Sequence, residues 1–467
     1  MARNRKTYLL KNTIIFIIGN LGSKFISFFL IPLYTNALTT AQYGTVDLIS
    51  TICNVAVPIF TLNVCEAVIR FSLDKDVNRE KITQIGTLVL LGSLILGVIL
   101  IPICGRISEV SNYSILVYFY TFSFASSLLY LCDLRGKELL LQYSIGNILN
   151  TFLLAVLNIL FLLYFHLGTE GFLLAYIGAN TVTAIYAIIV GKGYRSFKIT
   201  GIDKYKMIEM LKYSSILIPT SFMWWIMNSS DRIMITMIKG VAVNGIYSIS
   251  YKIPTLVSSF TNVINQAWSY SAIDEDEASD VQEYTNNTFR TMISFTILLG
   301  IVLLMIMKPF LKIYVTEAFF EAWKYTPFLL IGCIYFTLGL FMATSYTVHK
   351  DSKGYLLSSM IGAFINIALN FILIPQIGAY GAAIATCVSY VIYFFFVLLH
   401  TRKYMRYEII NREFLLGNIL LVLASIVMFF IEKRGIIFQF IIVLIALYVY
   451  KNFLTGLIRM VKKILKK

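Results

Sequence analysis

Charged residues are scarce in this sequence. Of its 467 residues, 13% are Asp, Glu, Lys or Arg and 58% are hydrophobic, and the mean hydropathy is +0.78. A soluble domain carries about 25% charged residues, so this composition excludes an ordinary soluble domain and indicates a polytopic membrane protein. The net charge of +15 comes from Lys and Arg scattered between apolar runs, which favours a role in membrane orientation over a nucleic-acid-binding surface.

Residues of metal and redox chemistry are also few. None of the six cysteines belongs to a C-x-x-C pair, and all lie in or beside apolar runs, where we expect small core residues. The three histidines are far apart, which argues against a metal site. No G-x-x-x-x-G-K-[ST] stretch is present, so we expect no ATP hydrolysis, no metal and no cofactor.

Long hydrophobic runs, by contrast, fill the chain. A membrane-spanning helix needs about 20 predominantly apolar residues, and on that rule the sequence predicts an all-α protein with about fourteen spans. Their approximate ranges are 12–33, 44–69, 84–104, 113–132, 142–165, 171–191, 213–238, 243–269, 289–307, 325–347, 355–375, 378–400, 413–432 and 435–452.

Lys and Arg in the connections predict the orientation of these spans. If the N-terminus is inside, the inner connections hold several times more of these residues than the outer ones, so we expect both termini in the cytoplasm. We expect the basic start of the chain to precede an uncleaved first span. The acidic segment 271–283 falls on the inner side, and we interpret it as the solvated face of a short helix. The basic, amphipathic stretch 456–467 suits an anionic inner leaflet.

A weak internal repeat divides the chain. Four features recur in the same order: Leu10 with Leu211, Gly44 with Gly245, Tyr143 with Tyr355, and Asn158 with Asn370. Spans 1–6 therefore match spans 7–12, and an even number of spans makes the two repeats parallel, with a substrate site at their interface.

The repeat gives the predicted architecture. Two parallel six-helix repeats surround a central cavity, and two extra helices follow at the C-terminus. The corresponding segments are an N-terminal lobe at 1–192, a cytoplasmic linker at 193–212, a C-terminal lobe at 213–400, and two additional helices with a basic tail at 401–467.

Polar side chains follow one face of four predicted spans at helical spacing. These faces are Asn20, Lys24 and Ser27 in span 1; Asp47, Thr51, Asn54, Pro58 and Thr61 in span 2; Ser221, Trp225, Asn228 and Arg232 in span 7; and Ser248, Lys252, Thr255, Ser259, Asn262 and Gln266 in span 8. Ser, Thr and Asn alone are explained by hydrogen bonds between helices. Full charges at membrane depth are harder to explain that way and indicate a water-filled, cationic cavity.

The charged residues are candidates for distinct roles. Lys24, Arg232 and Lys252 are the predicted cavity cations. Asp231 cannot share the helix face of Arg232, because adjacent residues point about 100° apart. We expect Asp231 to pair with a charge on a neighbouring helix, with Lys252 the nearest candidate in sequence. Asp47 and Glu66 lie nearer the span ends, where a structural role is an alternative.

The sequence resembles the Wzx-type polysaccharide flippases of the multidrug/oligosaccharidyl-lipid/polysaccharide exporter superfamily. The residues that carry the resemblance are "QYGTVDL" (42–48), "AVIRF" (67–71), "NSSDRIMI" (228–235), "NGIYSISYKI" (244–253) and "NFILIPQIGAYGAAIAT" (370–386). The resemblance covers essentially the whole chain and includes the number of spans.

This resemblance implies a function. Such proteins move undecaprenyl-diphosphate-linked oligosaccharides from the inner to the outer leaflet of the bacterial cytoplasmic membrane, for O-antigen, capsule or exopolysaccharide assembly. The pyrophosphate would then meet Lys24, Arg232 and Lys252, because Arg and Lys suit phosphate. Trp225 and the amides of Asn228, Asn262 and Gln266 would face sugars.

The resemblance also implies how transport is driven and which proteins take part. A proton or sodium gradient would drive it, with Asp47, Glu66 or Asp231 as the coupling carboxylate. A polymerase and glycosyltransferases of the same pathway are the expected partners.

Three alternatives remain. A lipid II flippase also has about fourteen spans and cationic cavity residues. Multidrug antiporters usually have twelve spans and bind cations, which favours acidic depth charges. A membrane-embedded polymerase, ligase or glycosyltransferase would carry a large outer loop, whereas the longest predicted outer loop here is roughly 308–324. We therefore expect a transporter rather than an enzyme.

Overall fold

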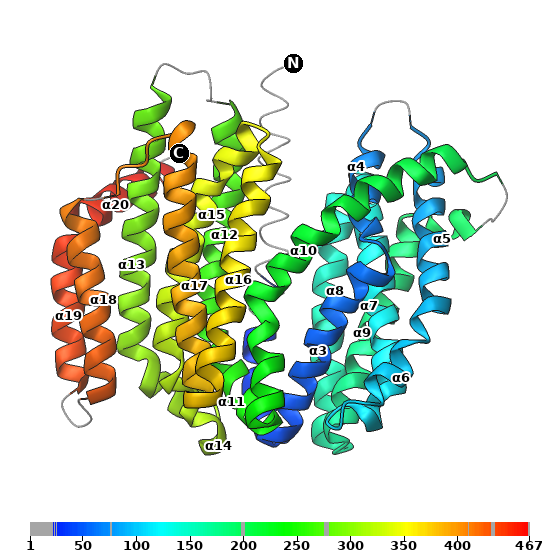
Figure 1. Ribbon diagram of the computed structural model, residues 1–467, viewed down its shortest axis with the longest axis horizontal. Coiled ribbons are helices and arrows are strands. Elements are labelled where there is room, and N and C mark those ends of the chain that lie inside the picture. The colour runs from blue at the N-terminus through cyan, green and yellow to red at the C-terminus, as the bar shows by residue number, and fades with distance from the viewer. Residues whose placement is uncertain are drawn as a thin grey trace. The chain divides into compact units, whose positions relative to one another are not determined.

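The computed structural model describes residues 22, 24, 26–74, 77–197, 201–274, 280–409, 411–430 and 435–465. Within these ranges all regular structure is helical, as predicted (Figure 1). The first predicted span, 12–33, lies mostly outside the described residues. Each of the other thirteen predicted spans coincides with a helix or with two consecutive helices.

The chain forms two compact units. Unit 1 comprises the described parts of residues 1–225 together with Gly240–Gly245, and unit 2 comprises Ile226–Lys239 and the described residues from Ile246 onward. The division falls within helix α10 (Lys204–Lys239) and not in the predicted linker 193–212. Part of that segment is the 3-10 helix η3 (Gly193–Phe197), which packs against helices α5 and α9. The lobe boundaries drawn from the repeat stay a prediction.

Helix α7 lies at the centre of unit 1, where it contacts α3, α4, α5, α6, α8 and α9. Its inward side contributes to an apolar core with residues of α4 and α5. The helices of this unit are α2 (Ile31–Ala37), α3 (Thr40–Phe60), α4 (Val64–Ser72), α5 (Arg79–Gly97), α6 (Leu100–Cys104), η1 (Ser111–Tyr113), α7 (Ser114–Gly136), α8 (Leu140–Asn158), the π-helical η2 (Ile159–Tyr164) and α9 (Gly168–Val190).

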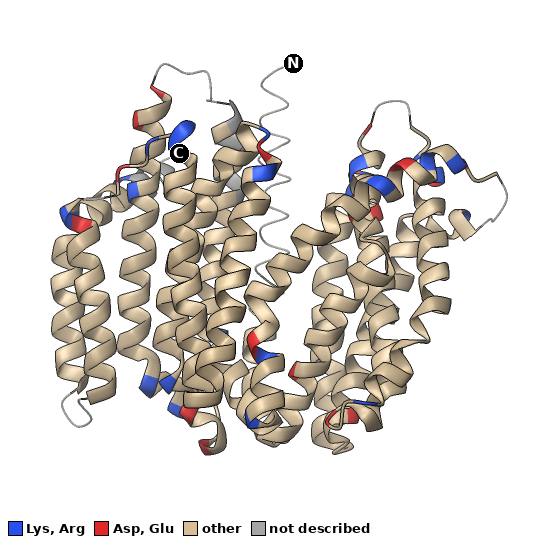
Figure 2. Ribbon diagram, in the orientation of Figure 1, with Lys and Arg blue, Asp and Glu red and all other residues tan. Residues whose placement is uncertain are grey.

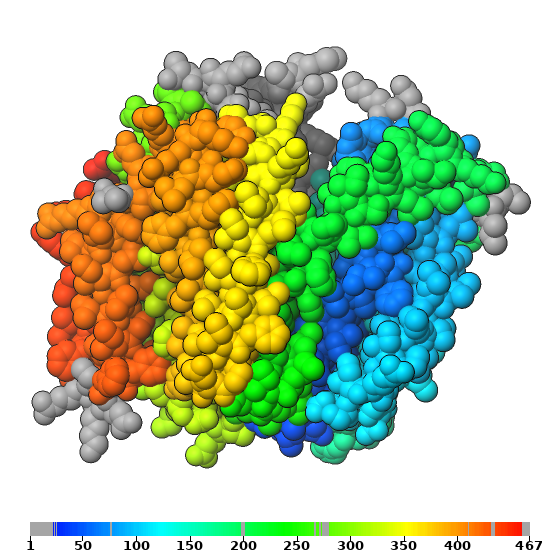
Figure 3. Space-filling view, in the orientation of Figure 1, coloured from blue at the N-terminus to red at the C-terminus, as the bar shows by residue number. Residues whose placement is uncertain are grey.

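Helix α15 has the corresponding place in unit 2, where it contacts α12, α13, α16 and α17. Helices α16 and α17 lie side by side on the face seen in Figure 3. After α11 (Val241–Ser250), the elements are α12 (Lys252–Asp274), α13 (Val281–Tyr314), α14 (Glu317–Phe320), η4 (Glu321–Lys324), α15 (Thr326–Val348), α16 (Ser352–Ile377), α17 (Ala379–His400), η5 (Thr401–Lys403), α18 (Arg412–Phe430), α19 (Gly435–Val449) and α20 (Lys451–Leu465).

Charged residues gather mainly at the helix ends, and most of the helix length carries none (Figure 2). Among the described residues, ten helices are long and apolar enough to cross a membrane. The number is eleven if the pair from α19 to Arg459, bent by 66°, counts as one span. Helices α10 and α12, which carry the predicted polar faces, are not in this set. The count of fourteen spans therefore stays a prediction.

Two predicted spans are broken. The predicted span 44–69 is interrupted between α3 and α4, where Leu62 and Asn63 have positive φ angles of 49° and 53°. Pro58 lies in the last turn of α3 and cannot donate to the preceding turn, which weakens the helix there. The predicted span 243–269 breaks at Tyr251, between α11 and α12. Pro254 in the first turn of α12 clashes with continuation of the preceding helix.

Candidate functional site

The carboxylate of Asp231 is buried in unit 2 and is surrounded by hydroxyl groups. The side chain of Tyr247 donates to its Oδ2 at 2.6 Å, that of Tyr251 at 2.8 Å and that of Thr386 at 3.4 Å. The backbone N–H of Arg232 donates to Oδ1 at 2.9 Å. Asp231 is 1% exposed, so the hydrogen bonds replace the water that a carboxylate needs.

A buried polar network continues from this carboxylate into α16 and α17. Asn366 donates to the hydroxyls of Thr386 at 3.3 Å and Ser389 at 3.4 Å. Its Oδ1 accepts from Ser230 at 3.1 Å and from Asn370 at 3.0 Å. Because these side chains come from three helices, the network fixes how α10, α16 and α17 pack around Asp231.

The sequence prediction for Asp231 assumed a charged partner. The structure instead gives hydroxyl and amide donors, and the pairing with Lys252 stays a prediction. Tyr247 and Tyr251 were missed, although they stand four residues apart on one helical face. Asn366 and Asn370 show the same spacing on α16, which is the signal that could have identified them.

The guanidinium of Arg232 lies over the ring of Tyr251, 5.0 Å from the centroid. One tyrosine therefore contacts both members of the Asp231–Arg232 pair: its hydroxyl bonds the carboxylate and its ring faces the cation. One turn earlier on α10, Asn228 accepts a hydrogen bond of 2.9 Å from Tyr390. Arg232 and Asn228 are both partly buried.

The remaining predicted residues of unit 2 lie on α12. Lys252 is its first residue, directly after the helix break, and is partly buried. Asn262 is exposed, and the side chain of Gln266 lies outside the described residues. Lys252 thus stands one position from Tyr251, whose ring and hydroxyl contact Arg232 and Asp231.

In unit 1, Asp47 is buried on α3. The side-chain amide of Asn244 donates to its carboxylate at 3.4 Å and to the Gly44 carbonyl oxygen at 3.3 Å. Glu66 is exposed in the first turn of α4, where a carboxylate favours the helix dipole, and Lys24 is an exposed helical residue. Asp47 is therefore the buried carboxylate of this unit among the three predicted coupling candidates.

Two glycines that the repeat paired, Gly44 and Gly245, meet where α3 crosses α11. A methyl group on Gly44 would lie 1.9 Å from the carbonyl oxygen of Val241, and one on Gly245 would lie 2.0 Å from that of Thr40. Only glycine permits this backbone contact, because any Cβ would overlap the opposite helix.

Trp225 faces a cavity of unit 1. Its indole N–H donates to the Thr51 carbonyl oxygen at 3.2 Å, which ties the end of this unit's part of α10 to α3. Its ring stacks on Phe222 with a centroid distance of 5.7 Å and an interplanar angle of 16°. Both rings line a cavity of about 260 Å³ between α3, α4, α7 and α10.

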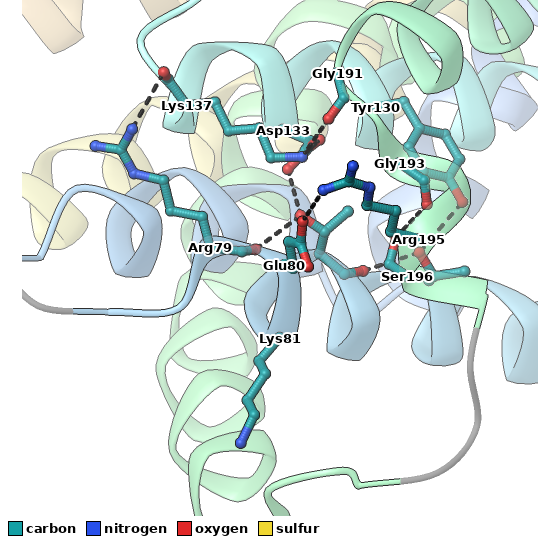
Figure 4. A network of polar contacts seen from close by, with 12 residues as sticks. Arg79, Glu80, Lys81, Tyr130, Asp133, Lys137, Gly191, Gly193, Arg195 and Ser196 are labelled. Carbon is teal, nitrogen blue, oxygen red and sulfur yellow. Dashed lines mark hydrogen bonds and ion pairs between the residues drawn. The ribbon is translucent and has the colours of Figure 1, made fainter.

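A charge cluster joins α5, α7 and the end of α9 in unit 1 (Figure 4). Lys137 donates to the buried carboxylate of Asp133 and to the Gly191 carbonyl oxygen, each at 2.7 Å. Thr83 also donates to Asp133, and Arg79 donates to the Lys137 carbonyl oxygen at 3.3 Å. The charges of Asp133 and Lys137 are balanced within the unit, so this cluster is structural.

Solved structures share this fold. The lipid II flippase MurJ in an inward closed conformation matches with a TM-score of 0.64 and 15% identity, covering 96% of this chain and 99% of that chain. A MOP superfamily transporter from Pyrococcus furiosus matches at 0.59 and 13%, covering 89% and 96%. The Vibrio cholerae MATE transporter VcmN matches at 0.55 and 13%, covering 85% and 95%. The predicted membrane fold and superfamily are confirmed.

Sequence comparison gives the family. None of the curated protein sequences matches this chain. The model of a family described as polysaccharide biosynthesis protein matches residues 9–270, which is more than half of the chain. That stretch includes α3, α10 and most of α12, the described helices that carry the predicted polar faces. This chain belongs to the polysaccharide biosynthesis protein family.

Proposed function

We propose that the protein is a flippase that moves undecaprenyl-diphosphate-linked oligosaccharides from the inner to the outer leaflet of a bacterial cytoplasmic membrane by alternating access. The family supports a role in surface polysaccharide assembly, such as O-antigen, capsule or exopolysaccharide. The fold, shared with a lipid II flippase and with MATE transporters, supports transport rather than catalysis.

The observation that carries the proposal is Arg232. It is a partly buried guanidinium in a helix of a membrane fold, where a charge costs at least a few kcal/mol. The acceptor oxygens of the neighbouring Asp231 are engaged by hydroxyls and a backbone amide. A diphosphate is the chemistry that a guanidinium fork recognises, with Lys24 and Lys252 as further cations.

The proposed sugar contacts are aromatic and amide groups. Trp225, Asn228, Asn262 and Gln266 are the residues assigned to this role, with Trp225 already at the wall of a cavity. A polymerase and glycosyltransferases of the same pathway are the proposed partners.

Asp231 is the proposed coupling carboxylate, ahead of Asp47 and Glu66. It is buried among oxygen-bearing side chains, and binding or release of a proton or sodium ion there would alter the hydrogen bonds of Tyr247 and Tyr251. These tyrosines stand where α11 meets α12, so the change would reach the helix break beside Lys252.

Cells test the proposal through their lipid-linked intermediates. In a strain that depends on this protein for its polymer, Arg232→Ala should leave the protein in the membrane and stop polymer export. Undecaprenyl-diphosphate oligosaccharides should then accumulate on the inner leaflet. Arg232→Lys should give intermediate export, because it keeps the charge and loses the bidentate geometry.

Two outcomes would contradict this assignment. Normal export by a folded Arg232→Ala variant would remove Arg232 from the substrate path. Rescue of a lipid II flippase deletion, with no effect on any polysaccharide, would favour peptidoglycan synthesis instead.

A further inference from the structure

The cavity of unit 1 has features of a binding site that the cationic residues do not explain. It encloses about 260 Å³ and lies against the break between α3 and α4. Its walls are formed by Asn54, Val55, Val57, Pro58, Ile59, Thr61, Asn63, Cys65, Phe124, Leu128, Ile218, Ser221, Phe222 and Trp225. None of these described lining residues is charged.

Three polar side chains at this cavity make no hydrogen bond within the described part of the chain: those of Asn54, Asn63 and Ser221. Helical serines normally donate to the preceding turn. Ser215 on the same helix follows that pattern, donating to the Leu211 carbonyl oxygen at 2.7 Å. Two amides and one hydroxyl are therefore available at one small site.

The aromatic wall supplies the second half of the chemistry. Phe222 and Trp225 are nearly coplanar, at 16°, and present a broad apolar surface beside these amides. A pyranose ring has an apolar C–H face, which packs on aromatic rings, and a rim of hydroxyls, which bond amides and hydroxyls. A cavity of about 260 Å³ is smaller than the 300–1,000 Å³ of typical ligand pockets. It suits a single ring rather than an oligosaccharide.

We propose that this cavity binds one uncharged sugar ring of the lipid-linked substrate, through Asn54, Asn63 and Ser221 at its hydroxyls and Phe222 and Trp225 at its apolar face. The inference rests on the proposed function and names the part of the substrate that unit 1 recognises. A diphosphate is excluded as the occupant because no cation lines the wall. An isoprenoid tail would leave two amides and a hydroxyl without partners, which is unfavourable in an apolar site.

The break between α3 and α4 places one of these groups. Asn63 has a left-handed backbone conformation, with φ of 53°, at the residue before α4. Its side chain does not cap the helix, so it lines the cavity without serving α4. Such discontinuous helices form substrate sites in transporters.

Binding of defined lipids to the full-length protein tests this. The probes are undecaprenyl diphosphate alone, the same lipid with one N-acetylhexosamine, and the same lipid with one hexuronic acid, compared by native mass spectrometry. The wild-type protein should bind the neutral glycolipid about tenfold more tightly than the bare lipid, as one or two hydrogen bonds allow, and should favour it over the acidic one.

Two variants remove the proposed contacts. Asn54→Leu has nearly the same shape without the amide, and Ser221→Ala is the smaller change if Asn54→Leu lowers the yield of folded protein. Each should lower affinity for the neutral glycolipid about fivefold and leave affinity for the bare lipid unchanged. Asn147→Leu is the matched control, because that amide serves its own helix, donating to the Tyr143 carbonyl oxygen at 3.0 Å.

The outcomes separate this inference from the function on which it rests. Equal binding of the bare and neutral glycosylated lipids by the wild-type protein would overturn the sugar site while leaving the flippase proposal intact. Equal gains for all three lipids in Asn54→Leu would assign the cavity to the lipid tail. Binding of none of the lipid diphosphates would overturn both proposals.

Discussion

Asp231 and Arg232 are adjacent residues with different surroundings. The carboxylate is 1% exposed and accepts hydrogen bonds from two tyrosines, whereas the guanidinium is partly buried over a tyrosine ring. The first arrangement is required for burial of a charge, and the second leaves a cation near membrane depth. We therefore expect the two residues to differ when substituted: Asp231 through stability and Arg232 through transport.

Replacing Asp231 by Ala should lower the thermal stability and the membrane abundance of the protein. The hydroxyls of Tyr247 and Tyr251 would lose their buried acceptor, at about 1–3 kcal/mol for each unsatisfied group. Adding Tyr247→Phe and Tyr251→Phe to Asp231→Ala should restore part of the loss, since both sides of each bond are then absent. The readout is the melting temperature of the detergent-solubilised protein. An unchanged melting temperature for Asp231→Ala alone would show that these bonds do not stabilise the fold.

At the scale of elements, the crossing of α3 and α11 depends on glycine. Gly44→Ala should severely reduce the amount of folded protein, because its Cβ would fall 1.9 Å from a backbone oxygen that no side-chain rotation can move. Gly92→Ala is the matched control: Gly92 lies inside α5 with nothing within 4 Å, so alanine should be neutral or slightly stabilising. Size-exclusion profiles of tagged protein compare the two variants. Normal folding of Gly44→Ala would contradict the close crossing.

The cluster in Figure 4 provides a second test between elements. Lys137→Met should lower stability by about 3–5 kcal/mol, because Asp133 would keep a buried charge without its cation. Lys81→Met on α5 is the control, since Lys81 is exposed and points away from the cluster. Thermal melting in detergent measures both. Equal effects of the two substitutions would indicate that the buried pair has no special weight.

Helix positions were predictable from the sequence and helix breaks were not. Thirteen predicted spans coincide with helices because a long apolar run admits few other structures in a membrane. The breaks at 61–63 and at Tyr251 were missed because both lie inside continuous apolar runs. In each case a proline stands three or four residues away, and hydropathy does not register its missing N–H donor.

The candidate site was predictable in part for a related reason. Arg232 and Asp231 stand out because charges are rare in apolar runs. The tyrosines and asparagines that hold the carboxylate are ordinary constituents of membrane helices, and their convergence depends on how α10, α11, α16 and α17 pack. The choice of Lys252 as the partner of Asp231 used proximity in sequence, whereas the structure supplies neutral hydroxyls.

At the scale of the whole molecule, the proposed orientation places both termini in the cytoplasm. All six native cysteines are described, five of them buried and Cys387 partly so, which gives a low background for labelling. A single cysteine at the exposed Asn36 should react with a membrane-impermeant maleimide in intact cells, and one at the exposed Lys204 should react only after lysis. Labelling of position 204 in intact cells would reverse the orientation. Labelling of the acidic segment 274–283 from outside would contradict the fourteen-span topology.

Transport of a lipid-linked sugar by the purified protein tests the central claim most directly. Proteoliposomes would carry fluorescent undecaprenyl-diphosphate oligosaccharide, and an enzyme outside the vesicles would report the fraction exposed over time. We predict that wild-type protein exposes nearly all of the substrate. A folded Arg232→Ala variant should expose only the fraction that starts in the outer leaflet, and Arg232→Lys should fall between them. Full exposure by Arg232→Ala, at the wild-type rate, would contradict the account that this cation at membrane depth receives the diphosphate.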